Sequence, residues 1–89
     1  MATTDWRTEA VDATGAPADR PVCAIDVRDD PPPGPLRRTL ETLADLDDET
    51  VLVQRNDREP RHLYPNLDDR GYEWATVETE AGVLTAVWR

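Results

Sequence analysis

A run of prolines in the first half of the chain divides it into segments that must fold differently. Four of the five residues 31–35 are proline, and the fifth is Gly34. Proline lacks a backbone N–H and fixes φ, so this run suits neither a helix interior nor a central strand, although a proline fits the first turn of a helix. We therefore expect a loop here and a helix that begins near Gly34.

The segment after the prolines carries the clearest periodicity in the sequence. Leucines stand at positions 36, 40, 43 and 46, a spacing that places them along one side of a helix. The acidic residues 47–49 follow directly and end the pattern. The spacing predicts an amphipathic helix that buries its leucine side.

Two runs with strand character flank this helix. In the run 22–28, Cys23, Ile25 and Val27 share one side, which is typical of a strand buried on one face and places Cys23 in the core. The run 50–55 is more continuously apolar, so we expect it near the centre of a sheet. A strand, a helix and a strand predict a right-handed crossover between two parallel strands.

The second half of the chain predicts a short helix and a hairpin. We expect one turn at 60–63 and a helix over 64–70, closed by Gly71. The runs 72–79 and 83–88 predict two strands joined by a tight turn. The order βαβαββ predicts an α+β two-layer sandwich, in which two helices cover one face of a four-stranded mixed sheet.

Residues 1–20 differ from the rest of the chain. Apart from the initial methionine, Trp6 and Val11 are their only large apolar residues, too few to offset the entropy of ordering a backbone. We expect a flexible N-terminal tail over 1–20 and a single domain over 21–89. The alternative is that Trp6 docks into an apolar groove of the domain.

The charge balance excludes several classes of partner. The 89 residues include 19 acidic and 10 basic side chains, which gives a net charge of −9, and every basic residue is arginine. Such a surface disfavours binding to nucleic acid or to an anionic membrane. The lack of lysine and the excess of 12 Asp over 7 Glu are typical of a protein kept soluble in concentrated salt, so we expect a salt-adapted, archaeal-type proteome. Because no membrane span or secretory signal is visible, we expect a cytoplasmic protein.

Several features together resemble the TusA/SirA-like sulfur-carrier superfamily over residues 21–89. They are Asp26-Val27-Arg28, Pro32-Pro33-Gly34-Pro35-Leu36 at the start of the leucine-rich helix, Thr50-Val51-Leu52-Val53 and the C-terminal hairpin. The resemblance implies the same layered fold. It also implies that some relatives lie beside, or are fused to, hemerythrin-like proteins and proteins of nitrogen-oxide metabolism.

The resemblance also says where a sulfur-carrying thiol would stand. Carrier members have a CPxP motif at the start of their first helix. Laid on this chain, the motif puts Pro32 in the place of the cysteine, while Pro33 and Pro35 match the two prolines. The chain resembles a branch of unassigned function that has PPxP there, and that also carries stretches like residues 54–61 and 70–72.

The residues themselves offer little catalytic chemistry. Persulfide carriage needs an exposed, activated thiol, whereas Cys23 is expected on the buried side of a strand. The sequence contains no serine, and the single histidine, His62, has no second nitrogen or sulfur donor near it in the sequence. We therefore expect no enzyme activity, no cofactor and no metal centre.

The carboxyl ends of the parallel strands 22–28 and 50–55 should meet at one edge of the sheet, the usual place for a ligand. The candidate ligand-binding or partner-binding residues there are Arg28, Asp30, Pro32, Pro33, Pro35, Arg55, Asn56, Asp57, Arg58 and His62. Arginines gathered near helix N-termini would suit a small anion or an acidic partner. Alternatively, these charges only cap helices and balance their neighbours.

The aromatic residues lie mostly in the second half of the chain. Tyr72 and Trp74 share one side of their predicted strand. On an uncovered sheet face they would form a protein-binding or dimer surface, whereas against the helices they would belong to the core.

These observations favour a non-catalytic protein-interaction domain of TusA-like fold that lacks the carrier cysteine. The partner would be an unidentified protein, and the chain a monomer or weak homodimer. By the resemblance, it would be accessory to redox or nitrogen-oxide metabolism. A second hypothesis is a small-anion or metal-ion binding accessory that uses the loop edge, and a third is a sulfur-transfer protein.

Overall fold

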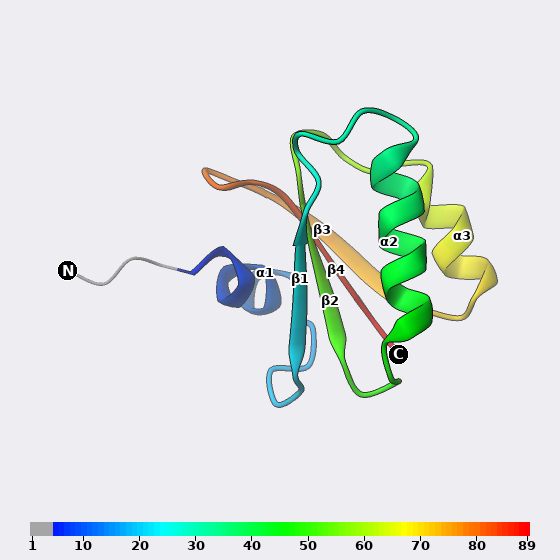
Figure 1. The fold of residues 1–89 in the computed structure, drawn as a ribbon. Helices are drawn as coiled ribbons and strands as arrows, with labels where there is room; N and C mark the ends of the chain where they lie inside the picture. Colours follow the sequence, from blue (N-terminus) through cyan, green and yellow to red (C-terminus); the bar gives the residue numbers. More distant parts are fainter. Residues whose placement is uncertain (1–4) are drawn as a thin grey trace.

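A four-stranded sheet with helices on both faces makes up the computed structural model, which describes residues 5–89 (Figure 1). In chain order the elements are α1 (Trp6–Thr14), β1 (Val22–Asp26), α2 (Gly34–Asp45), β2 (Val51–Asn56), α3 (Leu63–Asp69), β3 (Glu73–Thr79) and β4 (Gly82–Trp88). From β1 onward this is the predicted order. The α+β class and the four-stranded mixed sheet are confirmed.

The strands lie in the order β1-β2-β4-β3. β1 pairs with β2 in parallel, with Val22 opposite Val51 and Asp26 opposite Arg55. β4 pairs antiparallel with both β2 and β3. The predicted parallel crossover and the central place of β2 are thus confirmed, and the loops that follow β1 and β2 leave the sheet at the same edge, at the top of Figure 1.

α2 and α3 cover one face of the sheet, as predicted. Leu43 of α2 and Leu63 and Leu67 of α3 are buried in one cluster with Leu52 of β2. The ring of Tyr64 stacks on Trp74 at a centroid distance of 3.8 Å and an angle of 5°. These aromatic rings fasten α3 to β3, so they belong to the core and not to an exposed patch.

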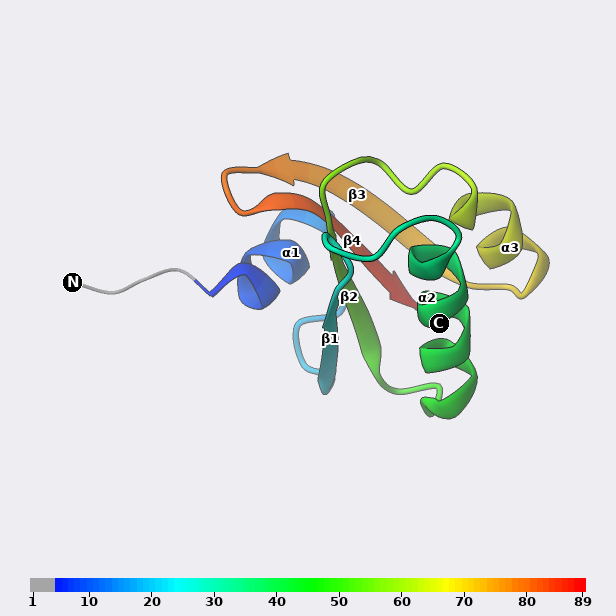
Figure 2. The ribbon, with the colours of Figure 1, turned by 45° about the horizontal axis from the view of Figure 1, so that its top comes forward.

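The other face of the sheet is covered by α1 (Figure 2). Because side chains alternate along a strand, Val51 and Val53 point away from α2 and pack against Ala10 and Val11 of α1. Trp88 packs into the same cluster. A third layer is therefore present beyond the two that the sequence predicted.

The prediction of a flexible tail over residues 1–20 is wrong for residues 5–20, and residues 1–4 lie outside the described residues. Asp5 caps α1 by accepting a hydrogen bond of 2.9 Å from the Arg7 N–H, and Gly15 ends the helix with φ +78°. The alternative, in which Trp6 docks, agrees with the structure, since Trp6 packs on the α1 cluster. Two of the three buried residues of this segment, Ala10 and Ala16, are alanines, which a count of large apolar residues does not include.

Most large hydrophobic side chains of the described residues are buried or half-buried. Within residues 5–89, Val22 is the only large hydrophobic residue classed as exposed. No helix in that range combines the length and the apolar character that crossing a membrane requires.

Candidate functional site

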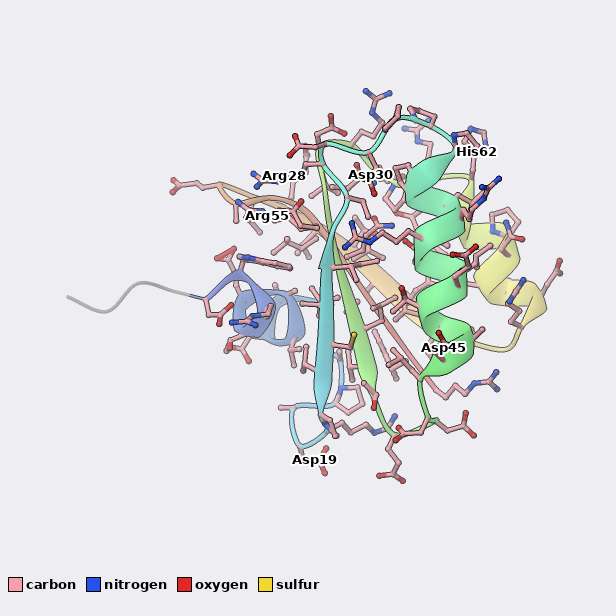
Figure 3. The ribbon with its side chains drawn as sticks, viewed as in Figure 1. Asp19, Arg28, Asp30, Asp45, Arg55 and His62 are labelled. Carbon is pink, nitrogen blue, oxygen red and sulfur yellow. The ribbon has the colours of Figure 1, made fainter. Side chains whose placement is uncertain are left out.

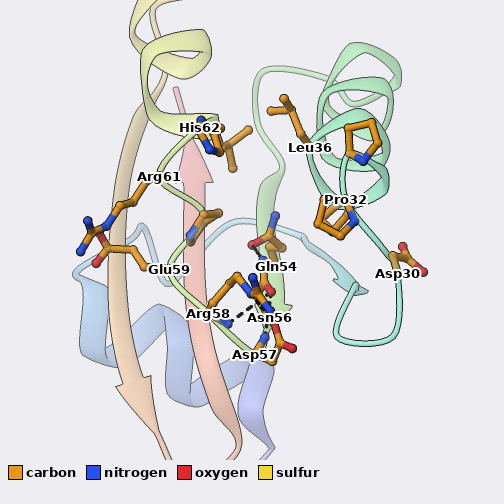
Figure 4. A pocket seen from close by; sticks show the side chains of 14 residues that line it. Asp30, Pro32, Leu36, Gln54, Asn56, Asp57, Arg58, Glu59, Arg61 and His62 are labelled. Carbon is orange, nitrogen blue, oxygen red and sulfur yellow. Dashed lines mark hydrogen bonds and ion pairs between the residues drawn. The ribbon is translucent and has the colours of Figure 1, made fainter.

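A pocket of about 470 Å³ opens at the edge where β1 and β2 end (Figure 4). One wall comes from the proline loop and the first turn of α2, with Pro32, Pro35 and Leu36. The opposite wall comes from the loop before α3 and includes Pro60 and Leu63. Rings and branched side chains thus face one another across the opening, and the volume lies in the range of ligand pockets.

The floor of the pocket is polar and buried. Gln54 and Asn56, at the end of β2, are 0% and 4% exposed. Gln54 Nε2 donates to Thr39 Oγ1 at 2.8 Å, and Asn56 Nδ2 donates to Gln54 Oε1 at 3.2 Å. Thr39 in turn donates to the Pro35 carbonyl at 2.7 Å. A continuous chain of hydrogen bonds therefore joins the start of α2 to the end of β2.

The same series of hydrogen bonds extends to the loop that follows β2. Asn56 Oδ1 accepts the N–H groups of Asp57 at 2.8 Å and Arg58 at 3.3 Å. Asparagine commonly holds a turn in this way, by accepting backbone N–H groups one or two residues on. Asn56 is thus the residue that ties the second pocket loop to the floor.

The charged residues at the rim pair with their neighbours. Arg58 Nε lies 3.3 Å from Asp57 Oδ1, and Arg61 Nε lies 3.4 Å from Glu59 Oε1. On the proline-loop side, Asp30 lies 3.4 Å from an arginine nitrogen of α2. The rim consequently carries both signs of charge in close pairs and no concentration of positive charge.

Arg55 points away from the pocket. It stands between Gln54 and Asn56 in β2, so the alternation of the strand sends it to the α1 face (Figure 3). Its Nε donates to the Ala81 carbonyl at 2.6 Å, and its guanidinium lies 5.4 Å from the ring centre of Trp6. Arg55 therefore helps to dock α1 and the β3–β4 hairpin.

Arg28 also lies outside the pocket. Its Nε and Nη2 donate to the Asp26 carboxylate at 3.0 and 2.9 Å. The Arg28 hydrogen bonds hold the pKa of Asp26 below its ordinary value, and Arg55 at 3.7 Å adds a weaker charge effect in the same direction. These two arginines are used to balance one carboxylate at the end of β1.

The structure brings together most of the predicted site. The predicted residues that line the pocket are Asp30, Pro32, Pro33, Pro35, Asn56, Asp57, Arg58 and His62. Arg28 and Arg55 do not line it. The lining residues absent from the predicted set are Leu36, Gln54, Glu59, Pro60, Arg61 and Leu63. Gln54 was detectable, because a glutamine two residues before Asn56 on a buried strand must share its face.

Cys23 does not take part in the site. It is half-buried and packs against the leucine cluster beneath α2 and α3, and it is not among the residues that line the pocket. Within residues 5–89, no three His, Cys, Asp or Glu side chains are grouped in a way that would hold a metal ion.

Residues 24–88 match the family model described as "Uncharacterized conserved protein (DUF2249)". The chain belongs to the DUF2249 family. The matched range of this DUF2249 protein contains both pocket loops and all the strands except the first two residues of β1. α1, which covers the second sheet face, lies outside the match.

One solved structure shares the fold of this DUF2249 protein. It is the crystal structure of a SirA-like protein from Desulfitobacterium hafniense, which matches with a TM-score of 0.62 and 23% identity over 74% of this chain and 92% of that chain. At this identity the likeness shows the fold, and it agrees with the layered fold that the resemblance to the TusA/SirA-like superfamily implies. A comparison with curated proteins found no match.

Proposed function

We propose that this chain is a non-catalytic protein-interaction domain that contacts its partner through the pocket between the proline loop and the loop before α3. The composition of the pocket carries the proposal. Its walls are apolar, at Pro32, Leu36 and Leu63, and its floor is a pair of buried amides. Binding pockets typically combine such apolar walls with a few fixed polar groups.

The proposed role includes no catalytic step and no cofactor. Transfer of sulfur or of an acyl group needs an activated nucleophile, and the pocket lining contains neither cysteine nor serine. The resemblance to the sulfur carriers puts Pro32 where the carrier cysteine stands. The accessory role in redox or nitrogen-oxide metabolism rests on that resemblance alone.

The charges favour a protein partner over a free anion. Arg58 and Arg61 are paired with carboxylates, and Arg28 and Arg55 lie outside the pocket. The net charge of −9 opposes nucleic acid and anionic membranes as partners. A partner segment that fills an apolar pocket does not depend on a cluster of positive charge.

The test compares capture by the full chain with capture by two variants. Leu36→Arg places a charge in the pocket wall, while Ala44→Arg places the same side chain on an exposed position of α2. The wild type and Ala44→Arg should retain the same protein from an extract of the native host in high salt, and Leu36→Arg should lose it. Equal retention by Leu36→Arg would contradict the proposal.

A folding defect must be separated from a binding defect, because Leu36 also packs against the core. Thermal melts of the three proteins provide that check. Pro60→Arg, on the opposite wall, should cause the same loss of the partner without touching α2.

A further inference from the structure

The hydrogen-bond chain at the pocket floor has a fixed direction. Its two ends are backbone groups, the Pro35 carbonyl, which can only accept, and the Asp57 N–H, which can only donate. Thr39 must therefore donate to Pro35 and accept from Gln54. Asn56 must turn its oxygen toward the loop and its nitrogen toward Gln54. The network itself therefore determines the orientation of both side-chain amides.

This direction determines what Asn56 can offer to a ligand. Its Oδ1 already accepts two backbone N–H groups, and its Nδ2 uses one hydrogen on Gln54 Oε1. A carbonyl oxygen has two acceptor sites and an amide nitrogen two hydrogens. The remaining capacity of Asn56 is one N–H, on a side chain that lines the pocket (Figure 4).

The rest of the pocket selects against a charged ligand. The ion pairs at the rim leave Arg58 and Arg61 beside carboxylates. A ligand carboxylate would have to compete with Asp57 and Glu59, and an ammonium group would meet the N–H of Asn56. Gln54 Nε2 likewise has one hydrogen beyond its bond to Thr39, so the buried floor offers N–H donors that remain free. Apolar walls and such donors fit a neutral acceptor with an aliphatic neighbour.

We infer that the pocket binds a neutral carbonyl group next to a compact aliphatic side chain, which is the chemistry of one residue in an extended peptide segment. The carbonyl oxygen accepts from Asn56 Nδ2, and the aliphatic side chain lies between Pro32 and Leu63. This inference rests on the proposed function, because a partner protein supplies such a segment.

The test uses N-acetyl-L-leucine N-methylamide as the probe and the full chain labelled with nitrogen-15. The side-chain amide resonances of Asn56 and the backbone resonances of residues 57–63 should shift saturably on titration. Inorganic phosphate at the same concentrations should leave them in place. No saturable shift with the probe, or a saturable shift with phosphate in its stead, would overturn the inference.

Asn56→Asp tests the donor itself. Aspartate keeps the oxygen that holds the loop and replaces the N–H donor with a second oxygen, so the affinity for the probe should fall at least tenfold. Asn66→Asp makes the same change on α3, where Asn66 Nδ2 donates to the His62 carbonyl at 3.1 Å, and should bind within twofold of the wild type. Unchanged affinity in Asn56→Asp would overturn the inference.

A second variant covers the case in which Asn56→Asp disturbs the fold, because its new oxygen faces Gln54 Oε1. Leu36→Ala removes part of the apolar wall and leaves the series of hydrogen bonds intact. It should also lower the affinity for the probe at least threefold. The experiments distinguish a failure of the proposed partner-binding function from a failure of the inferred ligand chemistry. If Leu36→Arg retains the partner while the probe binds as expected, the proposed function fails alone; if the partner is lost but the probe causes no shift, the ligand chemistry fails alone.

Discussion

The side-chain nitrogen of Gln54 lies 2.8 Å from the hydroxyl oxygen of Thr39, and both side chains are fully buried. This bond joins β2 to α2 beside the cluster of buried apolar side chains that includes Leu43 and Leu52. Within residues 5–89, no buried side-chain nitrogen or oxygen lacks a hydrogen-bond partner. The pair therefore fixes how α2, and the proline loop before it, sit over the pocket floor.

Thr39→Val should lower the free energy of unfolding by about 1–3 kcal/mol, because valine keeps the shape of threonine but leaves Gln54 Nε2 without an acceptor. Thr42→Val is the matched control. Thr42 makes the same bond to a carbonyl four residues earlier, at 2.7 Å, on the exposed side of α2, so its loss should cost under about 0.5 kcal/mol. Urea unfolding measures the loss of unfolding free energy in both variants. Equal losses would contradict the structural role of the bond between Gln54 and Thr39.

Gly82→Ala should destabilise the fold more than Gly71→Ala. Gly82 has φ +125°, and a Cβ there would lie 2.9 Å from the Asn56 carbonyl oxygen, whereas Gly71 has φ +78° with open space around it. Backbone strain alone costs about 1–2 kcal/mol, and the clash at Gly82 adds to it. Urea unfolding of the two variants tests the ranking. Gly82→Ala should also shift the side-chain amide resonances of Asn56, which Gly71→Ala should not.

The stability of the fold should depend on the ionisation of Asp26. Hydrogen bonds from Arg28 hold the pKa of Asp26 below its ordinary value of 3.8. A carboxyl group with a lowered pKa stabilises the folded state above that ordinary value, and the contribution is lost as the pH falls through the folded pKa. Asp26→Asn should therefore flatten the dependence of unfolding free energy on pH below about pH 4.

The size of that effect is limited by solvent. The side chains of Asp26 and Arg28 are 37% and 41% exposed, so the pair contributes under about 1 kcal/mol. Asp19→Asn is the control, since Asp19 lies in an exposed turn and forms no ion pair or side-chain hydrogen bond described within residues 5–89. If the unfolding free energies of the wild type and Asp26→Asn depended on pH in the same way below about pH 4, the proposed contribution of Asp26 would be contradicted.

The elements from β1 onward were predictable because their patterns are local. The leucine spacing at 36, 40, 43 and 46 defines α2 by itself, and the prolines before it exclude any earlier start. α3 begins at Leu63, one residue earlier than predicted, because the turn at 60–63 leads directly into it. α1 was not predicted, because tertiary contacts of Trp6, Ala10 and Val11 with the sheet hold it and its sequence carries no long apolar stripe.

The location of the site and most of its residues were predictable, whereas the positions of Arg28 and Arg55 and the role of Gln54 were not. Parallel strands bring their carboxyl ends together, which located the pocket loops correctly. Side chains alternate along β2, so Arg55 lies on the opposite face of the sheet from Gln54 and Asn56. A prediction that groups all charges at the loop edge does not take this alternation into account. The side-chain hydrogen bonds between Thr39, Gln54 and Asn56 depend on how α2 packs on β2, which no local pattern reveals.

Val11→Asp tests the packing of α1 on the sheet. Val11 is 6% exposed within the cluster that includes Val51 and Val53, so a carboxylate there should lower the free energy of unfolding by about 2 kcal/mol or more. Thr8→Asp introduces the same group on the exposed side of the first turn, where the helix dipole favours it, and should change stability little. If residues 5–20 were a flexible tail, both variants would melt like the wild type.

The net charge of −9 predicts that molar KCl raises the melting temperature, because salt screens repulsion between exposed carboxylates. Asp45 and Asp69 lie at the C-terminal ends of α2 and α3, where a negative charge opposes the helix dipole by about 0.3–1 kcal/mol each. The double variant Asp45→Asn/Asp69→Asn should therefore melt several degrees higher than the wild type at low salt and respond less to KCl. Melting curves that are flat from dilute buffer to several molar KCl would contradict this, and so would equal salt responses in the two proteins.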